Sequence, residues 1–221
     1  MEETLNPSVV FFIFGLPVTK IVVSTWFVMA FLVIASFIST RKLDFIPTRF
    51  LQNVLELFVE AIIYLIEDMS PGNGKKFLPL VGTLALFIGT ANLAGLVPGL
   101  SSPTSDFNTT LALALVVFCS VPYYGIKTRG VKDYFKDYIS PSPIMAPFHV
   151  ISEITRTFSL ALRLFGNILG EEIIIAILFL LSPLFVPVPM MLFSIFTGIV
   201  QAYIFTILTV VYLSAAVSRE N

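Results

Sequence analysis

Four long stretches of this chain contain no aspartate, glutamate, lysine or arginine. They are residues 21–40, 77–105, 107–126 and 173–218. A helix that crosses a lipid bilayer needs about 20 consecutive, mostly apolar residues, and each stretch reaches that length. The last stretch is long enough for more than one helix and is divided by Pro183, Pro187 and Pro189, which cannot continue a helix. The sequence therefore predicts a protein that crosses a membrane several times.

The composition excludes an ordinary water-soluble domain. Of the 221 residues, 57% are hydrophobic and 12% are charged, whereas soluble domains are roughly half apolar and about a quarter charged. Thirteen basic residues nearly balance 14 acidic ones, so no excess charge directs the chain to nucleic acid. The single cysteine, Cys119, gives no disulfide framework, and we expect no metal site and no cofactor. Glu2 and Glu3 replace the basic start of a signal peptide, so we interpret the N-terminus as mature sequence.

Two long helices are expected near the C-terminus. Residues 147–181 read as one helix of about 35 residues, or about 52 Å at 1.5 Å per residue. The hydrocarbon layer is about 30 Å thick, so this helix must tilt, bend or run partly along the interface, with Gly166 and Gly170 as expected bend points. A second long helix, at 188–218, follows a short connection. Short connections place consecutive helices side by side, so we expect a tilted antiparallel hairpin.

Residues 46–69 are expected to form a helix of another kind. Its polar side chains fall within about 60° of one line along the helix, and the rest of its surface is apolar. These polar residues are Arg49, Gln52, Asn53, Glu56, Glu60 and Glu67. A narrow polar stripe is typical of a helix that lies in the membrane interface or packs against a partner. We expect an amphipathic helix on the cytoplasmic side, without chemistry of its own.

Basic residues in the connections predict the orientation, because they favour the cytoplasmic side. Two connections, both expected to be cytoplasmic, contain nine basic residues: Arg41, Lys42, Arg49, Lys75, Lys76, Lys127, Arg129, Lys132 and Lys136. The connections at 99–106 and 182–187 contain no lysine or arginine and are placed outside, together with the N-terminal tail, 1–20. The C-terminus, with Arg219, is then cytoplasmic.

The expected fold is an all-α membrane protein and a single polytopic domain. It has five membrane-crossing helices plus one amphipathic interfacial helix. The crossings are predicted at 21–40, 77–98, 107–126, 147–181 and 188–218.

Several ionisable side chains fall inside these apolar segments. Such groups are costly in hydrocarbon, so each is a candidate functional residue. Arg163 is surrounded by aliphatic residues and cannot lose its proton, so it needs an anionic or strongly polar partner. Ser159 and Asn167 share its helix face at a spacing of four residues, whereas Glu172 points about 180° away and Glu171 about 80° away.

Gln201 is the main polar group of the last helix, and it needs a hydrogen-bond partner at that depth. The hairpin brings it to within about 5 Å of the depth of Arg163, so we expect its carbonyl oxygen to accept from the guanidinium. Packing between helices is the alternative role. Glu153 and Arg156, three residues apart, are interpreted as an interfacial ion pair rather than a site.

Three motifs resemble the a subunit of F-type ATP synthases. They are RLFGN at 163–167 followed by Glu171 and Glu172, QAYIF at 201–205 ahead of Leu208 and Thr209, and NLAGLVPG at 92–99. The resemblance covers essentially the whole chain. It implies a stator subunit in a bacterial plasma or inner membrane, with the N-terminus outside. Its partners would be a rotating ring of c subunits, each with one membrane-embedded carboxylate, and the b-subunit peripheral stalk.

The resemblance also implies roles for individual residues. Arg163 matches the family's essential arginine, which faces the c-ring. The implied ion-pathway positions are Glu172, Asn167, Gln201, Ser159, Asn92, Glu171 and Ser194. Ser194 stands where some bacterial members have a pathway histidine, and Gly95 stands where a pathway acid occurs near Asn92.

The function implied is ion translocation through two offset half-channels, which lead to and from the c-ring carboxylates. Arg163 would prevent a short circuit between them, and the flow of protons or sodium ions would drive ring rotation and ATP synthesis. The chain has no phosphate-binding loop of the form G-x-x-x-x-G-K-[ST], so it is not expected to be an enzyme on its own.

Two other classes of function were weighed. An independent secondary transporter would have Arg163 and Glu172 at its substrate site, but such transporters often contain internal repeats and paired broken helices, which this sequence lacks. A purely structural assembly subunit has no need for an arginine at membrane depth.

Overall fold

The computed structural model of the protein describes residues 9–13, 16–41, 50–97, 100–134, 146–182 and 187–218. The helices are α2 (Lys20–Thr40), α3 (Phe50–Met69), α4 (Gly74–Ala94), the 3₁₀ helix η1 (Pro103–Ser105), α5 (Phe107–Arg129), α7 (Ala146–Leu181) and α8 (Pro187–Val217). Five of them, α2, α4, α5, α7 and α8, are long and apolar enough to cross a membrane. The predicted all-α membrane fold is confirmed.

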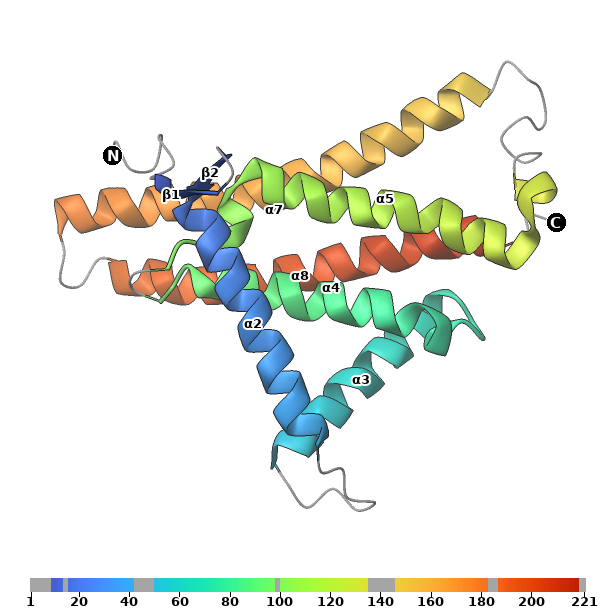
Figure 1. Cartoon of the computed structure of the whole chain (residues 1–221), viewed down its shortest axis with the longest axis horizontal. Coiled ribbons are helices and arrows are strands. Elements are labelled where there is room, and N and C mark those ends of the chain that lie inside the picture. Colours follow the sequence, from blue (N-terminus) through green and yellow to red (C-terminus); the bar gives the residue numbers. More distant parts are fainter. Residues whose placement is uncertain are drawn as a thin grey trace.

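Four helices, α4, α5, α7 and α8, pack into an antiparallel bundle (Figure 1). Apolar residues that recur on the facing sides of these helices form its core. The core residues are Leu84, Ile88, Ala114, Val117, Leu160, Ala161, Leu164, Ala202 and Phe205. Small residues at such contacts, including Ala114 and Ala161, let the helix backbones approach closely, which is how helices associate in membranes.

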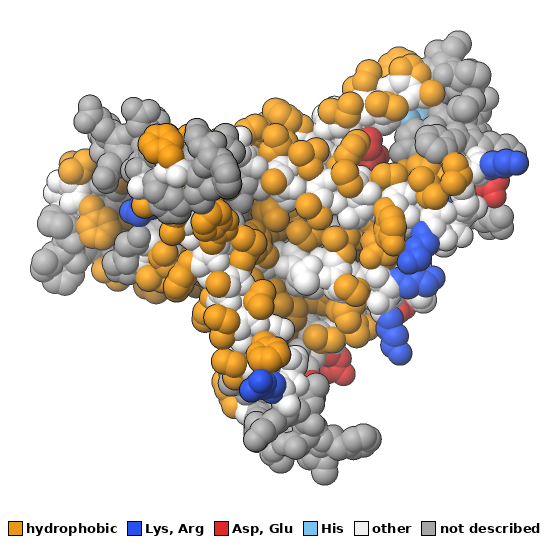
Figure 2. All heavy atoms as spheres, viewed as in Figure 1, with side chains coloured by type: hydrophobic (Ala, Val, Ile, Leu, Met, Phe, Trp, Pro, Cys, Tyr) orange, Lys and Arg blue, Asp and Glu red, His pale blue; other side chains and the backbone are white. Residues whose placement is uncertain are grey.

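The first half of α7 leans away from the bundle, whereas α2 and α3 form a triangle with α4 on its other side (Figure 1). None of the residues 146–159 is buried, and burial on α7 begins at Leu160. Hydrophobic side chains cover much of the visible face, and lysine and arginine gather mainly at the end where α4 begins and α5 ends (Figure 2). This distribution matches a bilayer around the helices and water at the basic end.

The connection between α3 and α4 explains one residue of the predicted polar stripe. The Glu67 carboxylate accepts hydrogen bonds from the backbone N–H groups of Gly72, at 2.6 Å, and Gly74, at 2.9 Å. Gly72 has a φ of +78°, which favours glycine. A Cβ at Gly74 would lie 2.4 Å from Glu67 Oε1, so a larger residue here would displace the carboxylate that binds the turn. Glu67 therefore holds the turn.

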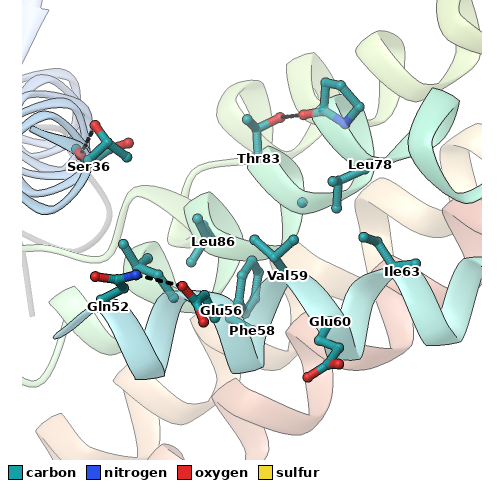
Figure 3. Close-up of a pocket in the computed structure, with 14 residues that line it drawn as sticks. Ser36, Gln52, Glu56, Phe58, Val59, Glu60, Ile63, Leu78, Thr83 and Leu86 are labelled. Atoms are coloured by element: carbon teal, nitrogen blue, oxygen red, sulfur yellow. Dashed lines mark hydrogen bonds between the residues drawn. The ribbon is translucent and has the colours of Figure 1, made fainter. Parts of the chain in front are cut away.

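Three other residues of that stripe line a cavity of about 600 Å³ between α2, α3 and α4 (Figure 3). Gln52, Glu56 and Glu60 contribute polar groups to a mainly apolar wall, and Gln52 donates a hydrogen bond to Glu56 Oε1 at 2.8 Å. No residue of α7 or α8 lines this cavity. Arg49, and residues 46–49 of the expected helix, lie outside the described residues, and α3 begins at Phe50.

The N-terminal tail contains structure that the sequence reading did not anticipate. Within the expected tail, β1 (Val9–Ile13) and β2 (Leu16–Thr19) pair as an antiparallel hairpin directly before α2. β1 consists of valine, phenylalanine and isoleucine, which favour strands. Residues 1–8 lie outside the described part, as do 183–186, with Pro183, and 219–221, with Arg219.

The helix at 77–98 was also predicted with the wrong limits. It is α4, which begins at Gly74 because the preceding turn is tied to Glu67, and ends at Ala94. Val97 precedes Pro98, and a residue before proline is disfavoured in helical conformation.

Candidate functional site

Arg163 projects from the exposed side of α7. Its neighbours Leu160, Ala161 and Leu164 are buried in the bundle core, so the helix is held by its other side. The Arg163 side chain is exposed, and no described residue forms a hydrogen bond or salt bridge with it. Ser159, one turn earlier, is exposed as well. A permanent cation on a mostly apolar helix surface requires a polar or anionic partner, and the described residues supply none.

Gln201 of α8 is buried and faces Asn167 of α7. Asn167 Nδ2 donates a hydrogen bond to Gln201 Oε1 at 2.8 Å. The expectation that this oxygen accepts from Arg163 is therefore wrong, because its partner lies one helical turn further along α7. The bond does place the two helices side by side as a hairpin at this depth. A hydrogen bond between two neutral amides thus joins α7 and α8 next to Arg163, and Arg163 bonds to neither amide.

Glu171 is buried between α7 and α8, and Ser194 of α8 donates a hydrogen bond to its carboxylate. Ser159, Arg163, Asn167 and Glu171 follow one another at intervals of four residues, so they form one slowly drifting line along α7. Ser159, Arg163 and Asn167 are exposed, Asn167 already bonds to α8, and Glu171 is buried against α8.

Glu172 points toward a different neighbour. Its Oε1 accepts a hydrogen bond from the backbone N–H of Ser102 at 3.1 Å, next to η1. An added Cβ at Gly95 would lie 3.4 Å from the same oxygen. The predicted divergence of the two adjacent glutamates is visible in their contacts, since Glu171 meets α8 and Glu172 meets the loop between α4 and α5.

Asn92 lies near this loop, at the end of α4, and is buried. Its Oδ1 accepts from Thr104 Oγ1 at 2.7 Å, and its Nδ2 donates to the carbonyl oxygen of Gly198 in α8 at 3.0 Å. Ser102 and Thr104 are functional candidates that sequence reasoning missed. They belong to the sequence SSPTS, which was treated as an ordinary outside connection. The sequence does contain a signal for them, because four hydroxyl side chains cluster at 101–105 between two apolar spans.

The basic end of the bundle contains a small cavity of about 150 Å³. Its walls include Arg129, Glu153, Arg156 and Tyr212, from α5, α7 and α8. The Arg156 guanidinium lies over the ring of Tyr212, 5.8 Å from its centre, and the described residues contain no ion pair between Glu153 and Arg156. That predicted pair is wrong, because the aromatic ring of α8 is the partner of the arginine.

Arg163 thus lies between two polar regions along α7. Arg156 precedes it by seven residues, or about 10 Å, and Glu172 follows it by nine residues, or about 13 Å. The segments between them present mostly aliphatic and aromatic side chains. The geometry is that of two separate hydrophilic regions, at opposite ends of the bundle, with one exposed cation between them.

Comparison with known proteins identifies the family. The family model described as "ATP synthase A chain" matches residues 22–214. An ATP synthase subunit a 2 from Bradyrhizobium sp. is 45% identical over 98% of this chain and 96% of its own length. An ATP synthase subunit a from Moorella thermoacetica is 40% identical, covering 95% of this chain and 96% of that protein. One from Crocosphaera subtropica, named ATP synthase subunit a 1, is 47% identical, over 90% and 87% respectively. The chain belongs to the ATP synthase A chain family.

Proposed function

We propose that this chain is the ion-translocating stator subunit of an F-type ATP synthase. The observation that carries the proposal is the position of Arg163, exposed on α7 between a polar region at each end of the bundle. The relatives named as ATP synthase subunit a support it. Family membership also speaks against an independent transporter and a simple scaffold.

Ion transfer proceeds through two half-channels that open to opposite sides. An ion cannot cross hydrocarbon directly, so each half-channel must end at a carrier within the membrane. Glu172, Glu171, Ser194 and Asn92 belong to the outer half-channel region. The cavity with Glu153 and Arg156 is the entrance on the basic, cytoplasmic side.

The carrier is a carboxylate on a neighbouring rotor ring of c subunits. It loads an ion from one half-channel, travels through lipid in its neutral form and unloads into the other. Arg163 attracts the unloaded carboxylate and separates the two channels, which prevents an ion from passing directly between them. Each charge moved is worth about 2.3 kcal/mol per 100 mV, so rotation must sum several transfers for one ATP.

Asn167 and Gln201 stabilise the α7–α8 contact beside the arginine through their mutual hydrogen bond. Because Gln201 is engaged with Asn167, the Arg163 guanidinium is free to turn toward the ring. Ser159 extends the exposed polar line on the cytoplasmic side of Arg163.

The remaining assignments are supported by membership of the ATP synthase A chain family. The subunit binds the c-ring and the b-subunit peripheral stalk, binds no nucleotide and no nucleic acid, and carries protons or sodium ions. It lies in a bacterial plasma or inner membrane. The N-terminus is outside and the C-terminus is in the cytoplasm, because the basic residues gather mainly at the end of the bundle where α4 begins and α5 ends (Figure 2).

The test is replacement of Arg163 in the complete complex in sealed vesicles. Arg163→Ala should abolish ATP-driven ion pumping while the subunit still inserts and assembles, since its side chain is exposed and contributes no core packing. Arg163→Lys should fail too, because a compact ammonium lacks the planar guanidinium fork. Near-normal pumping by the alanine variant would contradict the proposal.

A further inference from the structure

Glu172 is bound by a peptide group that is itself fixed by its surroundings. The Ser102 N–H donates to Glu172 Oε1 at 3.1 Å. The Ser102 side chain is 1% exposed, and its Oγ lies 2.9 Å from the Ala91 carbonyl oxygen of α4 and 2.8 Å from Thr104 Oγ1. The donor that meets the glutamate is therefore anchored to α4 and η1, and the loop has little freedom to move it.

The anchoring continues to α8 through two further side chains. Thr104 Oγ1 lies 2.7 Å from Asn92 Oδ1, and Asn92 Nδ2 donates to the Gly198 carbonyl oxygen at 3.0 Å. The hydroxyls of Ser102 and Thr104 supply two protons for three short oxygen contacts, so two of the three are hydrogen bonds at one time. Both polar atoms of the Asn92 amide thus form a hydrogen bond within the protein, which fixes the orientation of the amide.

Gly95 provides the space in which the loop meets the glutamate. A Cβ there would lie 3.0 Å from Ser102 Cβ, 3.4 Å from Glu172 Oε1 and 3.5 Å from the Ser102 nitrogen. The φ of Gly95 is −63°, which any residue adopts, so the backbone itself does not require glycine. The requirement is steric, and it arises at the contact between Ser102 and Glu172.

We propose that residues 100–106 form a clamp that positions Glu172 in the outer half-channel, and that Asn92 and Thr104 act through Ser102 rather than by binding the ion. This inference rests on the function proposed above. A carboxylate held by a rigid donor keeps its geometry as ions pass, as preorganised sites require. Asn92 and Thr104 are thus positioning residues.

The first test is Thr104→Val in the complete complex, reconstituted in vesicles and assayed for ion-driven ATP synthesis. This change keeps the shape but removes the hydroxyl that joins Ser102 to Asn92, so the rate should fall about fivefold. Thr104→Ser keeps the hydroxyl and should restore most of the rate. Thr110→Val is the matched control, because Thr110 is equally buried and its hydroxyl bonds to Phe107 within its own helix.

The second test repeats the change in a Glu172→Asp background, where the shorter carboxylate no longer reaches the Ser102 N–H. Thr104→Val should then cause no further loss in the rate of ATP synthesis, because the clamp no longer contacts the carboxylate. An equal loss in both backgrounds would overturn the clamp. Full activity of Thr104→Val beside an impaired Glu172→Asp would overturn it as well.

Two outcomes separate the clamp from the function on which it rests. Normal transport by Glu172→Asp and by Glu172→Gln would contradict the place of Glu172 in the ion path, whatever Thr104 does. If Thr104→Val fails to assemble, Gly95→Ala disturbs the same contact from α4 without removing a hydroxyl. It should lower the rate of ATP synthesis in the natural background and not in the Glu172→Asp background, and any other pattern would overturn the clamp.

Discussion

The two segments of α7 on either side of Arg163 are held in different ways. After Arg163, Asn167 bonds to α8, Glu171 accepts from Ser194, and Glu172 is bound by the loop before η1. Before Arg163, no residue of 146–159 is buried, and this half leans away from the bundle (Figure 1). The hydroxyls of Thr155 and Thr157 bond to carbonyl groups of their own helix.

The two segments therefore differ in how firmly their polar side chains are held in position. After Arg163, buried polar groups are paired with partners on α4, η1 and α8, so losing one partner leaves another unsatisfied. Before Arg163, no described residue of 146–159 is buried, and Glu153 and Arg156 line a small cavity. We therefore expect replacements after Arg163 to have larger effects than replacements before it.

The largest contrast is expected between two glutamates. Glu172→Gln should lower ion-driven ATP synthesis by more than about tenfold, because it removes the titratable carboxylate from the proposed ion path. Glu153→Gln, at the cytoplasmic cavity, should lower it by about twofold, since water and neighbouring groups replace one carboxylate at an open entrance. Initial rates in vesicles at equal content of assembled complex measure both. Equal losses would remove the distinction between the two segments.

A smaller effect is expected at the Glu171 contact. Ser194→Ala removes the hydroxyl that donates to the buried carboxylate, so the rate should fall about threefold and the complex should become less heat-stable. Ser120→Ala is a suitable control, because the Ser120 hydroxyl bonds to Val116 within α5. If the two variants behave alike in rate and in thermal inactivation, the bond between Ser194 and Glu171 does not matter for either.

The smallest effect is expected for the neutral bond between Asn167 and Gln201. Hydrogen bonds between membrane helices couple by about 0.6 kcal/mol on average, so the Asn167→Ala and Gln201→Ala variants should show a coupling of that size in unfolding free energy. The measurement is a double-mutant cycle. It compares the unfolding free energy of the detergent-solubilised natural subunit with those of both single variants and the double variant. Strict additivity would show that this bond contributes nothing to joining α7 and α8.

The sequence was sufficient for the parts of the fold that depend on lipid. Long uncharged stretches predicted the five apolar helices, because hydrocarbon tolerates no unpaired backbone and few charges. Because polar and charged side chains are costly in hydrocarbon, the sequence also identified Arg163, Glu171, Glu172 and Gln201 as candidate functional residues. The β1–β2 hairpin was missed because a short tail carries no comparable constraint.

The parts of the site that escaped prediction depend on packing between distant residues. Ser102 and Thr104 look like ordinary turn residues, and their importance arises from contacts with Glu172, 70 positions later, and with Asn92. The rise per residue placed Gln201 near the depth of Arg163, but it did not predict which residue of α7 the Gln201 side chain faces. Asn167, one turn away, bonds to Gln201 instead.

The most direct test of two separate half-channels on either side of Arg163 is sided chemical labelling. Glu172→Cys and Glu153→Cys are made separately in a Cys119→Ser background, and the assembled complex is treated with a membrane-impermeant thiol reagent from one side at a time. We predict that position 172 reacts from the outside and position 153 from the cytoplasm. Labelling of position 172 from the cytoplasm alone, or of both positions from the same side, would contradict the account.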